Sequence, residues 1–244
     1  MKSTTDTITS GTLYIISTPI GNLEDITLRA LRLLKEVDYI CAEDTRVTGR
    51  LLAHYEIKKK MISYHSYNER QRIPRILQTL KEGQQVALVS DAGTPGISDP
   101  AHRLVQEAIR EKIPVVPIPG PTAAIAALVA SGLPTNRFVF EGFLPRKKGR
   151  QTRLKQICEE NGTIIIYESA VRIQKTIEDI VKFCGNRYIV ICRELTKHYE
   201  EFIRGYAEEI LKNLSSRTLK GEIVLLVAGK DFKSSKDETE KLDE

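Results

Sequence analysis

The chain has 244 residues, of which 41% are hydrophobic, so it can bury a full core, and its length lies between one large domain and two small ones. It contains no run of about 18 uncharged apolar residues and no apolar stretch near its N-terminus, so we expect a cytoplasmic protein without a membrane span or signal peptide. The net charge is +5, although residues 231–244 hold six acidic residues and three lysines. The more basic remainder favours a polyanionic partner such as nucleic acid.

The first half of the chain alternates short β-branched apolar runs with stretches of helical period, which predicts an α/β lobe with a mainly parallel sheet. We expect strands at Leu13–Ser17, Val37–Ala42, Val86–Ser90 and Val115–Ile118. Helices are expected at Thr27–Glu36, Arg46–His54, Arg70–Lys81 and Ala101–Arg110. The Pro-Gly-Pro sequence of residues 119–121 ends this lobe, which we place at residues 1–120.

The second half begins with an alanine-rich helix at Thr122–Ser131 and then has fewer glycine-rich turns. Strands are expected at Phe138–Gly142, Thr163–Tyr167, Tyr188–Cys192 and Glu222–Ala228, and helices near Arg153–Glu160, Val171–Phe183 and Ala207–Leu214. The segment Tyr199–Arg204 can pair antiparallel, which predicts a mixed second sheet in a lobe at residues 121–230. Residues 231–244 are expected to form a disordered acidic tail.

Four cysteines occur, at Cys41, Cys158, Cys184 and Cys192. They show no CxxC spacing, and three of them lie within apolar runs. This distribution is typical of buried small hydrophobic residues. We therefore expect neither a metal site nor a disulfide framework.

Three strands of the first lobe are followed by turns of Gly, Pro and small polar residues, namely STPIGNLED (17–25), DAGTPGISDP (91–100) and PGPTAA (119–124). Any one of these turns is more often structural than functional. A strand-to-helix turn needs glycine for a positive φ, proline for a fixed φ and a small polar residue to cap the next helix. Three at the carboxyl ends of strands favour a ligand site, since open α/β sheets bind ligands there. None is a GxGxxG or GxxxxGK[ST] motif, so neither NAD nor a nucleoside triphosphate is indicated.

Nine short strings then occur in order between about Gly11 and Gly229: STPIGNLED, AEDTR (42–46), HSYNE (65–69), SDAGTPGISDP (90–100), PIPGPTAA (117–124), FEGFLPRKKGR (140–150), YES (167–169), RELTK (193–197) and KGE (220–222). Together they closely resemble a branch of the tetrapyrrole methylase superfamily that 2′-O-methylates a cytidine in the decoding region of 16S rRNA. The resemblance implies a two-lobe α/β fold, S-adenosyl-L-methionine as cofactor, 16S rRNA or the 30S subunit as substrate, and a homodimer.

Members of this superfamily hold the cofactor in a cleft between the lobes, largely through main-chain groups. The resemblance therefore implies a cofactor site made of Pro19, Asp91, Gly93, Thr94, Thr122, Ala123 and Tyr167. Methyl transfer is an in-line displacement, so the main task of such a site is to align the methyl carbon with the acceptor oxygen.

A ribose 2′-hydroxyl is a weak acid, so a nearby base or cation assists its methylation. The family strings offer His65 as the preferred base, with Glu43 and Arg46 as further catalytic candidates. Structural alternatives stay open for two of them, because His65 is equally explained as a hydrogen-bonded structural residue and Arg46 as an ion-pair partner at a helix N-terminus. Glu194 is expected to pair with Lys197 and is not a candidate.

A basic block follows the Leu144–Pro145 turn and comprises Arg146, Lys147, Lys148, Arg150, Arg153 and Lys155. A charge run is usually a solvated face, but this one can neutralise several phosphates. Phe140 and Phe143 precede it and can stack on an unstacked base, as single-stranded RNA sites require. We therefore expect Arg146, Lys147, Lys148, Arg150 and Arg153 to contact RNA.

Two rival functions remain open from sequence. A methyltransferase of the same fold acting on a corrin or porphyrin precursor would have little need of the basic block and would carry a more glycine-rich first loop. A non-catalytic RNA-binding ribosome-assembly factor would lack affinity for S-adenosylmethionine. A phosphate-binding α/β protein would need basic residues inside the three turns, which have almost none.

Overall fold

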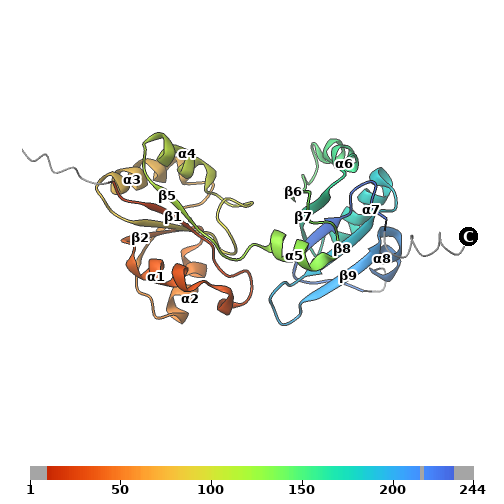
Figure 1. The fold of residues 1–244 in the computed structure, drawn as a ribbon, viewed down its shortest axis with the longest axis horizontal. Helices are drawn as coiled ribbons and strands as arrows, with labels where there is room; N and C mark the ends of the chain where they lie inside the picture. The colour runs from red at the N-terminus through yellow and green to blue at the C-terminus, as the bar shows by residue number, and fades with distance from the viewer. Residues whose placement is uncertain (1–9, 215–216, 234–244) are drawn as a thin grey trace, which may run out of the picture. The chain divides into compact units, whose positions relative to one another are not determined.

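The computed structural model describes residues 10–214 and 217–233. The chain divides into two compact units, Met1–Thr122 and Ala123–Glu244, each built on a five-stranded sheet (Figure 1). Among the described residues, no helix combines the length and the apolar character that crossing a membrane requires. Most of the predicted acidic tail, residues 234–244, lies outside the described residues.

The first unit contains the strands β1 (Leu13–Ile16), β2 (Tyr39–Ala42), β3 (Lys60–Ser63), β4 (Val86–Val89) and β5 (Val115–Ile118). Its helices are α1 (Leu28–Glu36), α2 (Thr45–His54), α3 (Glu69–Lys81) and α4 (His102–Arg110), with a short 3₁₀ turn at Leu23–Asp25. The strand order is β3-β2-β4-β1-β5, and every pairing is parallel, as predicted.

Alternation along the buried strands supplies a core on each face of this sheet. Ile16 packs into the core under α1 and α2, whereas Leu13 packs into the core under α3 and α4. The two helix pairs therefore cover opposite faces of the sheet (Figure 1). Because all five strands are parallel, the loops that follow them gather at one edge.

The strand β3 was not predicted from sequence. It lies at the edge of the sheet and pairs on one side only, with β2. Its four side chains are half-buried or exposed, so it has neither the continuous apolar run of a central strand nor a clear alternation. An edge strand of this kind carries a weak sequence signal.

The second unit contains the strands β6 (Phe138–Phe143), β7 (Thr163–Ser169), β8 (Tyr188–Arg193), β9 (Glu201–Tyr206) and β10 (Glu222–Val227). Its helices are α5 (Ala123–Ser131), α6 (Arg150–Cys158), α7 (Ile173–Cys184) and α8 (Ala207–Leu214). The order is β6-β7-β10-β8-β9, with β6 parallel to β7 and the other pairs antiparallel. The predicted mixed sheet is confirmed, and the segment predicted to pair antiparallel forms β9.

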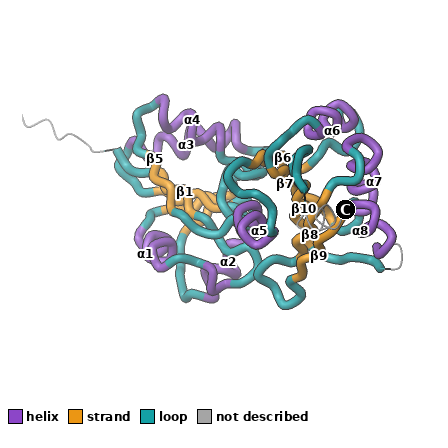
Figure 2. The backbone as a smooth tube through the Cα atoms, turned by 45° about the vertical axis from the view of Figure 1, so that its right-hand side comes forward, coloured by secondary structure: helices purple, strands orange, loops and turns teal. Residues whose placement is uncertain are grey.

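The helices of the second unit are divided between the two faces of its sheet. Helices α6, α7 and α8 share one core with Ile164 and Ile166 of β7. Helix α5 packs against β7, β8 and β10 without joining that core. Figure 2 shows the strands of this unit in orange with α6, α7 and α8 along one side of them.

The expectation that no cysteine forms a disulfide is wrong for one pair. Cys158 at the end of α6 is bonded to Cys184 at the end of α7, with a Cα–Cα distance of 4.8 Å. The two helices pack on the same face of the sheet, which brings residues 26 positions apart in the sequence together. Cys41 and Cys192 are buried free thiols, as expected, and burial raises the pKa of each to about 12.

Candidate functional site

The loops after β1 and β4 are joined by a two-residue antiparallel bridge. The Thr18 amide donates to the Gly93 carbonyl at 2.9 Å, and the Gly93 amide donates back to the Thr18 carbonyl at 3.0 Å. The Thr18 hydroxyl adds a bond to the carbonyl of Ser90 at 3.1 Å. Gly93 has φ +82°, a conformation that glycine adopts without strain. The first two glycine-rich turns therefore form one rigid structure.

The third turn is fastened to the other two by hydroxyl groups. Thr94 Oγ1 donates to the carbonyl of Pro121 at 3.1 Å, and it lies 2.8 Å from Ser17 Oγ. Since the Thr94 proton is used at Pro121, Ser17 is the donor in the second bond. A Cβ at Gly120 would lie 2.8 Å from the Cβ of Ser17, so only glycine fits there. The structure thus brings together the loops that carry Pro19, Asp91, Gly93, Thr94 and Thr122.

The loop after β2 is tied to the same edge by carboxylates. The amide of Asp44 donates to Asp91 Oδ1 at 2.9 Å, and the amide of Asp91 donates to Glu43 Oε2 at 3.4 Å. Glu43 and Asp91, predicted as catalytic and cofactor-binding residues, are therefore neighbours. Their loops come from adjacent strands, β2 and β4.

The structure places Arg46 in the ion pair considered as its structural alternative. Asp44 caps α2 by accepting the amide of Arg46 at 2.8 Å, and its Oδ2 lies 2.6 Å from the Arg46 guanidinium. Hydrogen bonds from Arg46 lower the pKa of Asp44 well below its usual range. The Arg46 side chain is 87% exposed, so the pair is a surface feature of the helix start.

His65 is held by Asn68 in a way that leaves it without an available basic nitrogen. Asn68 Oδ1 accepts the His65 amide at 2.9 Å, so the Asn68 side-chain amide group faces His65 Nε2, at 3.1 Å, as a donor. Neutral His65 then carries its proton on Nδ1, which is buried and has no partner among the described residues. This geometry favours the structural interpretation of His65.

Three carboxyl groups near this edge have raised pKa values. Burial is the main cause for Glu43, Asp91 and Asp99, and repulsion by neighbouring carboxylates adds to it. The pKa of Asp99 reaches about 6, because burial is reinforced by the charge of Glu43. Carboxylates held in this way are better proton acceptors near neutral pH than ordinary acidic side chains.

Replacing Asp99 with Asn is expected to stabilise the first unit at pH 7.5 but not at pH 4. The folded state binds the Asp99 proton more tightly than the unfolded chain, so ionised Asp99 lowers the free energy of unfolding. This destabilisation is absent below the usual pKa of 3.8, grows towards pH 6 and is complete above it. After allowance for solvent screening, we expect a gain of about 1 kcal/mol. Thermal unfolding at both pH values tests this, and an equal gain at pH 4 would contradict it.

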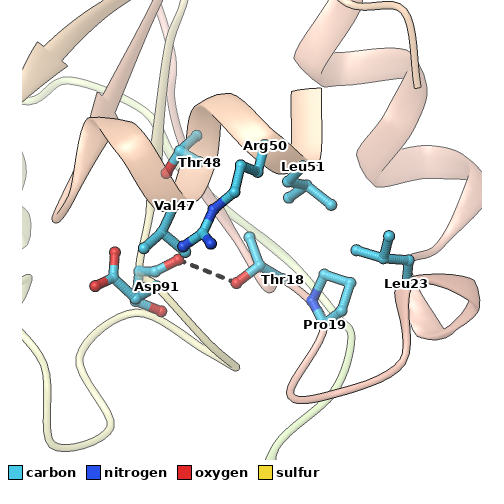
Figure 3. A pocket seen from close by; sticks show the side chains of 9 residues that line it. Thr18, Pro19, Leu23, Val47, Thr48, Arg50, Leu51 and Asp91 are labelled. Atoms are coloured by element: carbon cyan, nitrogen blue, oxygen red, sulfur yellow. Dashed lines mark hydrogen bonds between the residues drawn. The ribbon is translucent and has the colours of Figure 1, made fainter. Parts of the chain in front are cut away.

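A pocket of about 210 Å³ lies within the first unit, between α2 and the loops after β1 and β4 (Figure 3). We call it the α2 pocket. Its lining residues are Thr18, Pro19, Leu23, Val47, Thr48, Arg50, Leu51, Ser90 and Asp91. In Figure 3 the Arg50 side chain extends from α2 towards Thr18 and Asp91. The pocket therefore adjoins two residues predicted to bind the cofactor, Pro19 and Asp91.

The predicted cofactor residues of the second unit lie where β7 meets the start of α5. The hydroxyl of Tyr167 accepts the amide of Ala124 at 3.2 Å, next to Ala123. The Tyr167 ring packs edge-on against Phe140 and Phe143, with centroids 5.0 and 5.6 Å apart. The aromatic residues that precede the basic block therefore form one cluster with Tyr167.

The basic block separates into bound and free cations. Arg150 is largely buried and donates to Asp179 at 2.8 Å and to the Thr176 hydroxyl at 2.9 Å. Arg153 lies 2.5 Å from the buried carboxylate of Glu141. Arg146, Lys147 and Lys148 are exposed, and within residues 10–214 and 217–233 no ion pair involves them. Of the five residues predicted to contact RNA phosphates, only these three therefore carry a cation that is free to do so.

Arg150 belongs to a buried polar network that holds the start of α6 against α7. The Thr176 hydroxyl receives the bond from Arg150 and donates to Glu168 Oε2 at 2.7 Å. Glu168 also lies 3.5 Å from Arg172, which donates to the carbonyl of Leu144 at 3.2 Å. The loop between Leu144 and Arg150 is thus anchored at both ends.

Sequence reasoning missed several residues that the structure brings forward: Thr48, Arg50, Asp99, Thr176 and Asp179. Thr48 and Arg50 look like ordinary members of a surface helix, and Asp179 like a solvated acid on α7. Only Asp99 carried a signal, as the second acidic residue of the SDAGTPGISDP string. The expected pair of Glu194 and Lys197 is present, at 3.0 Å. In the described ranges no cluster of His, Cys, Asp and Glu could hold a metal ion.

Comparison with known proteins gives matches over most of the chain. Residues 12–211 match the model of the tetrapyrrole (corrin/porphyrin) methylases. The chain is 52% identical to ribosomal RNA small subunit methyltransferase I of Halalkalibacterium halodurans, over 93% of this chain and 79% of that protein. It is 49% identical to the protein of the same name from Thermotoga maritima, over 91% of this chain and the whole of that protein.

Solved structures share the fold at low identity. The methyltransferase CobJ superposes with a TM-score of 0.68 at 21% identity, covering 92% of this chain and 97% of that one. Uroporphyrin-III C-methyltransferase from Thermus thermophilus, complexed with S-adenosyl homocysteine, gives 0.63 at 18% identity, covering 90% and 98%. These likenesses confirm the expected fold.

Proposed function

We propose that this chain, which belongs to the tetrapyrrole methylase family, transfers a methyl group from S-adenosylmethionine to the 2′-hydroxyl of a cytidine in the decoding region of 16S rRNA. Within that family it belongs to the ribosomal RNA small subunit methyltransferase I proteins. One observation carries this proposal: about half of the residues are identical over nine-tenths of the chain to relatives that bear this name. We further propose that it works in the cytoplasm as a homodimer on the 30S subunit.

The three joined loops of the first unit fit a cofactor held by main-chain groups. Gly120 leaves no room for a side chain, and the φ of +82° at Gly93 favours glycine, so the backbone itself lines this edge at both positions. Pro19, Asp91, Gly93, Thr94 and Thr122 would hold the cofactor there, and Ala123 and Tyr167 are proposed to contribute from the second unit. When bound, S-adenosylmethionine supplies an electrophilic methyl group on a sulfonium. The chain's own contribution is to orient the acceptor and to remove its proton.

We propose Glu43, with its raised pKa, as the group that takes this proton in place of His65. Replacing Glu43 with Gln is expected to lower kcat about 10²-fold, since general bases contribute at least this much. The acidic limb of the pH profile of kcat, which reports deprotonation of the base above the usual glutamate pKa, should be lost as well. Single-turnover rates of Glu43→Gln and His65→Gln test the assignment. A larger loss in His65→Gln would restore His65 as the base.

Reversing the charge of Arg146, Lys147 and Lys148 to Glu is expected to raise the KM for 30S subunits about 10²-fold at moderate salt, because their phosphate contacts are replaced by repulsion. Affinity for S-adenosylhomocysteine should not change. The matched control reverses Lys35, Lys58 and Lys59, which lie in the first unit. Equal KM values for the two triple variants would show that the block is only a solvated face.

The test of the proposed function is to incubate the protein with labelled cofactor and 30S subunits from a strain that lacks the modification. Label on a single cytidine 2′-oxygen is the expected result. Absence of S-adenosylmethionine affinity in calorimetry, alone or with RNA, would favour an assembly factor without catalysis. Transfer to a corrin or porphyrin precursor instead of RNA would favour the rival methyltransferase function. The shared fold alone does not support that function.

A further inference from the structure

We propose that the α2 pocket receives the base of one nucleotide of the substrate RNA, and that Arg50 binds the phosphate beside it. This inference rests on the proposed function and names a substrate site within it. The pocket lies wholly in the first unit, between α2 and the loops after β1 and β4.

The size of the pocket selects a small ligand. At about 210 Å³ it is smaller than the roughly 300–1,000 Å³ of pockets that bury drug-sized molecules. A single pyrimidine ring fits this space, whereas a complete S-adenosylmethionine molecule needs more. The size of the pocket therefore suits one base of the substrate better than the whole cofactor.

The walls of the pocket suit a flat ring with a polar edge. Pro19, Leu23, Val47 and Leu51 supply apolar surface for its faces. Thr48, Ser90 and Asp91 also line the pocket and supply polar groups for the edge of the ring. An apolar slot with a few placed polar groups is the usual form of a site that recognises a base extruded from its stack.

Thr48 carries a polar atom that the folded protein leaves unused. Its side chain is buried, and Thr48 Oγ1 has no hydrogen-bond partner among the described residues. By contrast, the hydroxyl of Thr18 in the same pocket is satisfied by the carbonyl of Ser90. Burying a hydroxyl without a partner is unfavourable, so a ligand with a carbonyl or amino group on its edge accounts for this threonine.

Arg50 supplies a cation at the pocket. It is exposed, and no ion pair to it is found in the part of the chain that the structure describes, whereas Arg46 one turn earlier is paired with Asp44. Its planar guanidinium can donate two parallel hydrogen bonds to a phosphate. Because Pro19 and Asp91 also line the pocket, a nucleotide seated there holds its ribose beside the loops assigned to the cofactor.

The inference is tested with Thr48→Val and Arg50→Gln in the full chain, and with Arg75→Gln on α3 as the matched control. The kcat/KM for 30S subunits should fall about tenfold or more in Arg50→Gln and about fivefold in Thr48→Val, and Thr48→Ser should restore it. Affinity for S-adenosylhomocysteine should be unchanged throughout. The unfolding midpoint of Thr48→Val should be unchanged or higher, because an unpartnered hydroxyl is removed.

The outcomes distinguish failure of the proposed function from failure of the α2 pocket as a substrate site. If the unmodified protein does not methylate 30S subunits, the proposed function fails, and this inference with it. If it does, and both variants behave like Arg75→Gln, the α2 pocket is not a substrate site. Loss of S-adenosylhomocysteine affinity in step with activity would also overturn the inference, since the pocket would then belong to the cofactor.

Discussion

Replacing Arg150 with Ala is expected to lower the free energy of unfolding of the second unit by about 3 kcal/mol, because it leaves the buried carboxylate of Asp179 with only the exposed Lys175, 3.4 Å away, as an ion-pair partner. The guanidinium also satisfies the hydroxyl of Thr176, which in turn bonds Glu168. One substitution therefore disturbs the whole network under the basic block. Hydrogen exchange of the α7 amides measures this loss for the second unit by itself.

The control for this prediction is Arg146→Ala, which removes an exposed cation of the same block that forms no ion pair within the described residues. Its loss should change the free energy of unfolding by less than about 0.5 kcal/mol. The double variant Arg150→Met with Asp179→Leu should recover most of the stability, since neither charge is then left unpaired. If Arg150→Ala and Arg146→Ala lose equal stability, Arg150 is not the anchor described above.

Replacing Gly120 with Ala is expected to reduce methylation about 10²-fold, the loss associated with a displacement of about 1 Å in a reacting geometry. The new Cβ would meet that of Ser17 at 2.8 Å, so the loops after β1 and β5 must move apart. The bond between Ser17 and Thr94 would then stretch, and with it the joined edge. Calorimetric affinity for S-adenosylhomocysteine and single-turnover rates measure the effect.

Gly132→Ala is the matched control, because a Cβ there has nothing within 4 Å. Its φ of +83° makes Ala strained, so it reproduces a backbone cost without a collision. The variant should lose some stability and keep its cofactor affinity. Normal affinity in Gly120→Ala would show that the three loops need not be held at their observed spacing.

The sequence was most informative where a segment is buried on both faces. The runs that became β1 and β4 are short and apolar, lie inside the sheet and end in turns of Gly and Pro, which is the pattern of a central parallel strand. The turns after them could be assigned to one edge because parallel strands point the same way. β3 escaped prediction because its residues are half-buried or exposed and lack this pattern, whereas the other edge strand, β5, has a short apolar run followed by Pro-Gly-Pro.

The sequence was least informative where a side chain's role depends on a distant partner. Arg150 had the appearance of one more cation in a basic run, and only the packing of α6 on α7 reveals Asp179, 29 residues away. The disulfide has the same origin, since Cys158 and Cys184 meet only through those helices. Thr48 gave no signal, because an unpaired hydroxyl is a property of the folded environment.

The bridge between Thr18 and Gly93 also has a consequence for folding. Thr18 and Gly93 are 75 positions apart in the sequence, and Ser17 and Thr94 are 77 apart. Bringing such distant residues together has a large loop-closure entropy cost, so these bonds cannot form before β1 pairs with β4. A partly folded chain therefore contains all of these sequence motifs, but its three loops are not yet joined at one edge of the sheet. Ligand affinity at that edge is therefore gained in the same late step that completes the sheet.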